Sequence, residues 1–204
     1  MATRAGVRRL LAHLWSVSPS SVRFTNAPCP ACRISAHGPP LAGSTEAGVA
    51  LPISVSRTHG LAALALAGET RLGIDVEARP TPADQESEPN SARWQRISAA
   101  LRLACTPEEE ATIHATASIA DRLALYDRCW TRKEAVVKAM GLGLAWDLRS
   151  LPVRPLEPGP LHITVPERPP HLWLVHDLPW PPGRNGTAAL AVPAVITPWT
   201  GTSG

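Results

Sequence analysis

The sequence predicts a chain of mixed helices and strands. Strand patterns occur near both ends of the chain, at residues 53–56, 61–67, 161–165, 172–178 and 187–192. Apolar and polar residues alternate in the later strands, and prolines mark their connections, which is typical of an antiparallel sheet. A long helical pattern lies between the two groups of strands, from Ile119 to the glycines that begin at Gly141.

The length of 204 residues allows one large domain or two small ones. The net charge of +3 is mild and no basic block is present, which argues against a nucleic-acid partner. The apolar runs are too short to span a membrane. Residues 5–15 predict an amphipathic helix without the long apolar region and cleavage site of a signal peptide. We therefore expect a cytoplasmic protein whose four cysteines are reduced.

Two charged residues interrupt the apolar face of the long helix. With Trp130 as reference and about 100° per residue, that face also includes Lys133 and Glu134, and Lys138 borders Glu134 one turn further on. Burying a lone charge is costly, so these groups need partners. One interpretation is an exposed Glu134–Lys138 pair. The flanking Trp130 and the Gly-Leu-Gly sequence at 141–143 favour a functional site instead.

A pair of carboxylates lies upstream on a predicted strand. Because alternate side chains of a strand point the same way, Asp75 and Glu77 share one face. Together with Glu134 they would make an all-oxygen site for a hard divalent cation. Magnesium suits such a site, with waters and ligand phosphate oxygens completing its coordination.

The two segments together resemble a known family. Gly-Ile-Asp-Val-Glu at 73–77, followed by Trp-Thr-Arg-Lys-Glu-Ala-Val-Val-Lys at 130–138, is similar to the two-part signature of the 4′-phosphopantetheinyl transferases. The order, the separation and the Gly-Leu-Gly tail all match. The resemblance extends more loosely from Leu10 to Val192.

The resemblance implies an α+β fold with two similar halves packed as a pseudo-dimer in one chain. The smaller holo-acyl-carrier-protein synthases have one such half and assemble as oligomers. A length of 204 residues favours the two-half, surfactin-synthetase-activating (Sfp-type) form, expected to be a monomer. Residues 1–70 would form the N-terminal half with the coenzyme phosphate contacts. Residues 71–204 would form the C-terminal half with both motifs.

The implied reaction moves the 4′-phosphopantetheine arm of coenzyme A, the co-substrate, to a serine of an apo acyl or peptidyl carrier protein. Adenosine 3′,5′-bisphosphate leaves, and the holo carrier serves fatty-acid, polyketide or nonribosomal-peptide biosynthesis. By the resemblance, Asp75, Glu77 and Glu134 hold Mg²⁺. Glu134, directly or through a water, takes the serine proton, while Lys138 and Lys133 bind phosphate oxygens.

The coenzyme contacts depart from the family pattern at two positions. The family places a phosphate-binding histidine after the serine that matches Ser56, but Arg57 stands there and His59 follows two residues later. Arginine is a competent phosphate ligand, although a solvated arginine in a hairpin turn at 57–60 is the alternative. The basic residue that relatives often carry in the Gly-x-Pro step is Pro39 here, and Arg33 would compensate for it.

Three further expectations complete the prediction. Cys29, Cys32 and His37 offer either three zinc ligands or a tight loop of thiols, since a structural zinc site needs four ligands and no second pair follows. Residues 41–50 should form a loop. Thr106 should cap a helix, with Glu109 as its capping-box partner.

Two alternative functions remain open. One is a non-catalytic relative that binds coenzyme A or a nucleotide without transferring anything. The other is a small zinc-dependent regulator built on the two cysteines and the histidine of the 29–37 segment.

Overall fold

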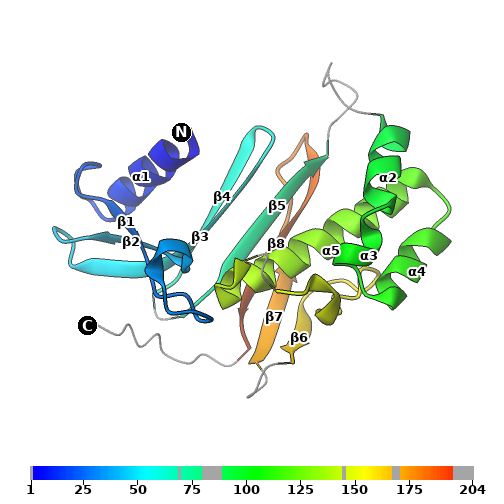
Figure 1. Cartoon of the computed structure of the whole chain (residues 1–204). Coiled ribbons are helices and arrows are strands. Elements are labelled where there is room, and N and C mark those ends of the chain that lie inside the picture. The colour runs from blue at the N-terminus through cyan, green and yellow to red at the C-terminus, as the bar shows by residue number, and fades with distance from the viewer. Residues whose placement is uncertain (1, 69, 80–88, 144–145, 167–170, 195–204) are drawn as a thin grey trace.

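The computed structural model describes residues 2–68, 70–79, 89–143, 146–166 and 171–194. Two four-stranded antiparallel sheets lie side by side, and helices cover them (Figure 1). The mixture of helices and strands expected from the sequence is therefore confirmed. No helix within these ranges is both long and apolar enough to cross a membrane.

The first sheet comes from the N-terminal third of the chain. Its strands lie in sequence order: β1 (Arg23–Asn26), β2 (Pro40–Ser44), β3 (Val49–Thr58) and β4 (Leu61–Leu66). Helix α1 (Ala2–Leu14) packs across it, because Val7 and Leu11 share a core cluster with Val22 and Ile53. Helix and sheet thus form a two-layer unit with its own core.

The second sheet is built from strands far apart in the sequence. Its order is β5 (Gly73–Arg79), β8 (Asn185–Pro193), β7 (His171–Asp177) and β6 (Leu161–Val165). Helix α5 (Ile119–Met140) runs across this sheet (Figure 1). A Cβ atom at Gly73 would collide with the carbonyl oxygen of Ala135, so only glycine lets β5 approach the helix this closely.

Three short helices precede α5, and the last of them is capped as its sequence predicts. They are α2 (Asn90–Ser98), α3 (Leu101–Ala104) and α4 (Pro107–Ala115). Thr106 and Glu109 form the expected capping box at the start of α4. Ser118 caps α5, and Gly141 ends it in the left-handed conformation with φ of 75°. The boundaries expected for the long helix are thereby confirmed.

The two sheets meet along β3 and β5. Hydroxyl side chains of β3 accept hydrogen bonds from alternate amides of β5: Ser54 from Ile74 at 3.0 Å, Ser56 from Val76 at 3.3 Å, and Thr58 from Ala78 at 2.9 Å. The side chains therefore satisfy amide groups that a neighbouring strand would otherwise bind. We call these three hydroxyl contacts the seam.

Two local expectations were wrong. Residues 41–50 do not form one loop, because β2 ends at Ser44 and pairs with β3, leaving only a turn between them. Arg57 and Thr58 are not in a turn but end β3, opposite Ala62 and Leu61 of β4. Small residues give little strand pattern of their own, and the pairing partner decides their conformation.

Candidate active site

Asp75 lies at the centre of a group of charged side chains beside the seam. It is 4% exposed on β5. Its Oδ1 accepts hydrogen bonds from the Ser56 hydroxyl at 2.7 Å and from Lys138 Nζ at 2.6 Å. Its Oδ2 is buried and has no hydrogen-bond partner among the described residues. A buried carboxylate oxygen without a partner is costly, and a bound cation would satisfy it.

Two glutamates share the electrostatic environment of Asp75. Burial raises the pKa of Glu77 to about 7, and the negative charges of Asp75 and Asp127 add to the increase. Burial also raises the pKa of Glu134, again with a contribution from Asp75. Glu134 Oε1 is the second buried carboxylate oxygen of this group without a partner. The negative charge of Asp75 thus adds to the raised pKa of both glutamates, and such a group favours a nearby positive charge.

The donor set suits a hard divalent cation. All three side chains offer oxygen, which Mg²⁺ prefers, and two of the oxygens lack a partner. Among the described residues, two groups of three side chains have ligand atoms within 4.8 Å of one another, and neither contains these carboxylates. The three carboxylates are thus not gathered as closely as the side chains of those groups, and an Mg²⁺ ion held by them would keep several waters.

Lys138 pairs across to β5 and not along its own helix. Its Nζ lies 2.6 Å from Asp75 Oδ1 and 3.3 Å from the carbonyl oxygen of Ile74. Glu134, one turn earlier, keeps its unpartnered oxygen. The interpretation as an exposed Glu134–Lys138 pair is therefore wrong, because helix and strand are close enough for a cross-element pair.

Lys133 is not brought to the carboxylates. It is fully buried, with its Nζ 2.6 Å from Glu109 Oε2 and 2.8 Å from the carbonyl oxygen of Leu148. Glu109 in turn accepts a hydrogen bond from the Val153 amide at 2.7 Å. The buried charge thus has the partner it needs, but in the core between α4 and α5.

Arg132, one position earlier, is also fully buried. Its guanidinium makes a two-point contact with the Asp177 carboxylate at 2.8 and 2.6 Å. It also donates to three backbone carbonyls, those of Val153, Arg154 and Glu157. Arg132 therefore ties α5 to the end of β7 and to the segment before β6.

A group of ion pairs that the sequence did not predict lies close enough to Glu77 to affect its pKa. Asp127 on α5 binds Arg93 at 2.6 and 3.2 Å, and Arg79 lies 3.3 Å from it. The negative charge of Asp127 contributes to the raised pKa of Glu77. Its position on α5, three residues before Trp130, gave no sign of these partners, which come from α2 and β5.

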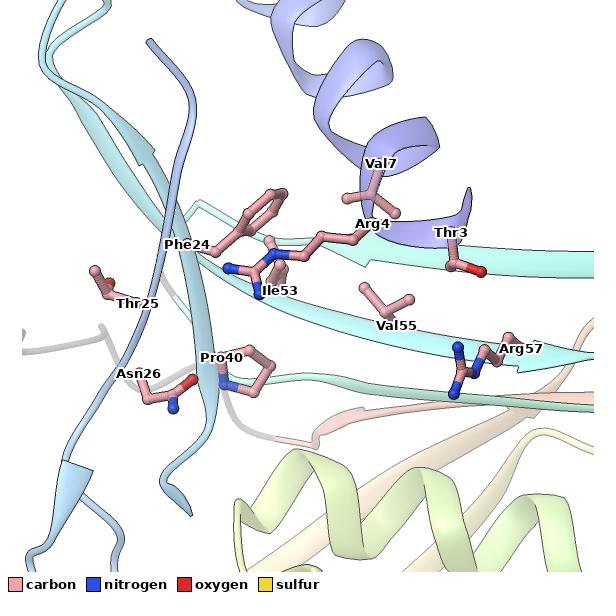
Figure 2. Close-up of a pocket in the computed structure, with 10 residues that line it drawn as sticks. All are labelled: Thr3, Arg4, Val7, Phe24, Thr25, Asn26, Pro40, Ile53, Val55 and Arg57. Carbon is pink, nitrogen blue, oxygen red and sulfur yellow. The ribbon is translucent and has the colours of Figure 1, made fainter. Parts of the chain in front are cut away.

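A cavity of about 490 Å³ lies between α1 and the first sheet, as Figure 2 shows. Its wall combines cations, hydroxyls and apolar groups: Thr3, Arg4, Val7, Phe24, Thr25, Asn26, Pro40, Ile53, Val55 and Arg57. The guanidinium of Arg4 lies 5.2 Å from the centre of the Phe24 ring. Arg4 and Phe24 were not expected from the sequence, since the N-terminal helix carries no recognisable motif.

Two successive residues of β3 reach the cavity and the carboxylates. Arg57 lines the cavity, and the preceding Ser56 donates to Asp75. Arg33 lies elsewhere, exposed in the loop between β1 and β2. Burial lowers the pKa of the Arg71 guanidinium, and the positive charge of Arg33 lowers it further. His59 is exposed at the tip of the β3–β4 hairpin.

Comparison with protein families identifies the class. A model of the 4′-phosphopantetheinyl transferase superfamily matches residues 71–192, which include both carboxylate-bearing segments. The chain belongs to this superfamily, and phosphopantetheinyl transfer is the activity associated with it. A search of curated proteins finds no match.

Proposed function

We propose that the chain transfers the 4′-phosphopantetheine arm of coenzyme A to a serine of an apo acyl or peptidyl carrier protein. The serine oxygen forms a bond to the β-phosphorus of the coenzyme pyrophosphate, and adenosine 3′,5′-bisphosphate leaves. The observation that carries this proposal is the pair of unpartnered buried oxygens, Asp75 Oδ2 and Glu134 Oε1, within the family-matched region.

The same oxygens favour a magnesium-dependent reaction. Asp75, Glu77 and Glu134 are the residues that would hold the ion, because they combine the unpartnered oxygens with carboxylates of raised pKa. When bound, Mg²⁺ would neutralise the pyrophosphate and favour departure of the nucleotide. Ser56 would position Asp75 through the hydrogen bond at 2.7 Å.

Glu134 and Lys138 have separate roles in this proposal. Burial raises the pKa of Glu134 toward the working pH, which improves a carboxylate as a base for the serine proton. Lys138 Nζ is partly exposed beside Asp75 and can hold phosphate oxygens. Lys133, buried against Glu109, is left out of this set.

The cavity beneath α1 is the proposed site for the nucleotide end of the coenzyme. Arg57 and Arg4 supply positive charge for phosphates, and Phe24 supplies an apolar surface for a base. Ser56 and Arg57 point to opposite faces of β3, so a coenzyme bound in the cavity would have to extend past this strand to reach the carboxylates. The exposed Arg33, in the loop between β1 and β2, is a second candidate for a phosphate contact.

The two-half form is proposed on the same structure. Each sheet has four antiparallel strands and packs against one long helix, α1 or α5. We propose that residues 1–70 and 71–204 are the two halves and that the chain is a cytoplasmic monomer. Light scattering of the purified chain tests the oligomeric state.

Intact-mass analysis tests the reaction. A panel of apo fatty-acid, polyketide and nonribosomal-peptide carrier proteins is incubated with the chain, coenzyme A and Mg²⁺. A mass gain of one phosphopantetheine on at least one carrier supports the proposal and names the substrate. Coenzyme binding by calorimetry without any mass gain would favour the non-catalytic alternative.

A further inference from the structure

The loop between β1 and β2 brings two cysteines and a histidine together. Residues 27–39 leave β1 and return to β2, and hydrogen bonds within the loop close a tight turn. The Arg33 amide donates to the carbonyl oxygen of Cys29 at 2.8 Å, and the Cys29 amide donates to Ile34 at 3.2 Å. Arg33 adopts a left-handed conformation with φ of 66°. This turn folds the Cys-Pro-Ala-Cys segment back on itself.

The three side chains of the loop converge on one point. The ligand atoms of Cys29, Cys32 and His37 all lie within 4.8 Å of one another. Cys32 Sγ is 3.0 Å from His37 Nε2. Two sulfurs and an imidazole nitrogen at this separation match the ligand types and spacing of a tetrahedral zinc site.

A second cluster of possible metal ligands lies in the protein core and provides a comparison. Cys105, Glu109 and Cys129 also have ligand atoms within 4.8 Å of one another, but all three are buried. The ammonium of Lys133 lies 2.6 Å from Glu109 and supplies the positive charge. The loop cluster differs because both lysines of the chain, Lys133 and Lys138, pair elsewhere, and because Cys32 and His37 are exposed.

We propose that Cys29, Cys32 and His37 bind a zinc ion, with water as the fourth ligand. Sulfur and imidazole ligands select zinc over magnesium, so this site is chemically distinct from the carboxylate site. Cys29 is buried and anchors the ion from the protein side, while the exposed Cys32 and His37 leave room for the water.

The loop that carries the three ligands contacts both α5 and the cavity. A Cβ atom built on Gly141 would lie 2.9 Å from the ring of Pro39, so the loop rests on the C-terminal end of α5. At its two ends Asn26 and Pro40 line the cavity beneath α1 (Figure 2). Zinc binding would therefore fix one wall of the cavity against the helix that carries Glu134 and Lys138.

Metal analysis of the full chain, without a histidine tag and purified under reducing conditions, tests the proposal. We expect about one zinc per chain, and near-complete loss of that zinc in Cys32→Ser and in His37→Ala, because each removes one of only three protein ligands. His162→Ala is the matched control, since His162 is exposed on β6, and it should keep the metal. Thermal melts establish that each variant is folded.

Cobalt substitution gives a second measurement that does not depend on activity. Co²⁺ added to the zinc-free chain should produce intense thiolate-to-cobalt absorption in the near ultraviolet, and Cys32→Ser should weaken it. Equal zinc in the wild type and both variants would mean an adventitious ion only and overturn the proposal. A zinc-free wild type that takes up neither added Zn²⁺ nor added Co²⁺ would also overturn it. So would a Cys29–Cys32 disulfide in the freshly purified chain.

Discussion

The Ser56 hydroxyl donates a hydrogen bond to Asp75 Oδ1 at 2.7 Å, although the two residues belong to different sheets. The same hydroxyl accepts the Val76 amide at 3.3 Å. One serine therefore joins the seam and orients a carboxylate of the candidate active site. Arg57, the next residue, reaches the cavity. The relative position of the two sheets thus bears directly on the proposed chemistry.

Ser56→Ala tests this relationship. Hydrogen bonds to charged groups are worth about 1.5–3 kcal/mol, so transfer should slow about tenfold or more. Ser54→Ala is the matched control, because Ser54 accepts the Ile74 amide at 3.0 Å but contacts no carboxylate. Both variants should lose similar stability in urea unfolding. Equal transfer rates in the two variants would contradict a positioning role for Ser56.

Glu77 predicts a pH dependence of stability. Its pKa is about 7 in the folded chain, above the ordinary value of 4.5. Between these values the folded state keeps a proton that the unfolded state has lost, so the free energy of unfolding falls as pH rises through this window. Glu77→Gln should flatten this part of the profile. Urea unfolding at several pH values without metal measures it, with the exposed Glu46→Gln as control.

The same group predicts how magnesium affects stability. A bound cation favours the ionised carboxylate, so Mg²⁺ should stabilise the chain most above pH about 7 and bind more weakly below it. A magnesium-induced rise in melting temperature that is the same at acidic and alkaline pH would argue against Glu77 as a ligand. Asp75→Ala should abolish the rise and transfer together while the fold persists.

Glu134 and Lys138 should respond differently to magnesium. Glu134→Gln keeps one oxygen but removes charge and basicity, so turnover should fall by about 10²–10⁴-fold, as for loss of a general base. Lys138→Met should also lower turnover, because Asp75 loses its ammonium partner and the phosphates lose a contact. Extra Mg²⁺ should not rescue Lys138→Met. Transfer rates measured over a range of Mg²⁺ concentrations distinguish the two variants. If both variants behave like the wild type, the catalytic interpretation of α5 is wrong.

Arg132 should matter for stability and not for magnesium. Lysine cannot reproduce its two-point contact with Asp177 and its three carbonyl contacts. Lysine keeps the charge but loses several of these hydrogen bonds, each worth about 1.5–3 kcal/mol, so Arg132→Lys should lower the free energy of unfolding by at least the value of one such bond. Arg128→Lys, which alters a single contact to the Pro155 carbonyl, is the control. An unchanged melting temperature would contradict this assignment.

The cavity arginines predict a defect in coenzyme binding. Arg57→Ala and Arg4→Ala should each raise the KM for coenzyme A about tenfold, with a smaller effect on kcat, because a charge-assisted phosphate contact is lost. If one of these arginines contacts the 3′-phosphate, its alanine variant should discriminate less than the wild type between coenzyme A and the 3′-dephospho analogue. Arg102→Ala, an exposed cation on α3, serves as control. Full discrimination in both variants would direct attention to Arg33 and His59.

The sequence by itself determined the local structure of the chemistry-bearing segments. The helix that begins at Ile119 ends at Gly141, because an amphipathic period and a glycine cap are local signals. Strand alternation likewise placed Asp75 and Glu77 on one face of β5. The requirement that Lys133 have a buried partner was also readable, since an isolated buried charge is too costly.

Only the tertiary structure decided which partners these residues meet. Lys133 and Glu134 are neighbours in one motif, yet the first pairs with Glu109 in the core and the second lies beside Asp75. A helix turns about 100° per residue, and only the packing of α4 and β5 on either side of it settles what each face contacts. The Ser56 contact depends in the same way on the packing of β3 against β5, which no local pattern encodes.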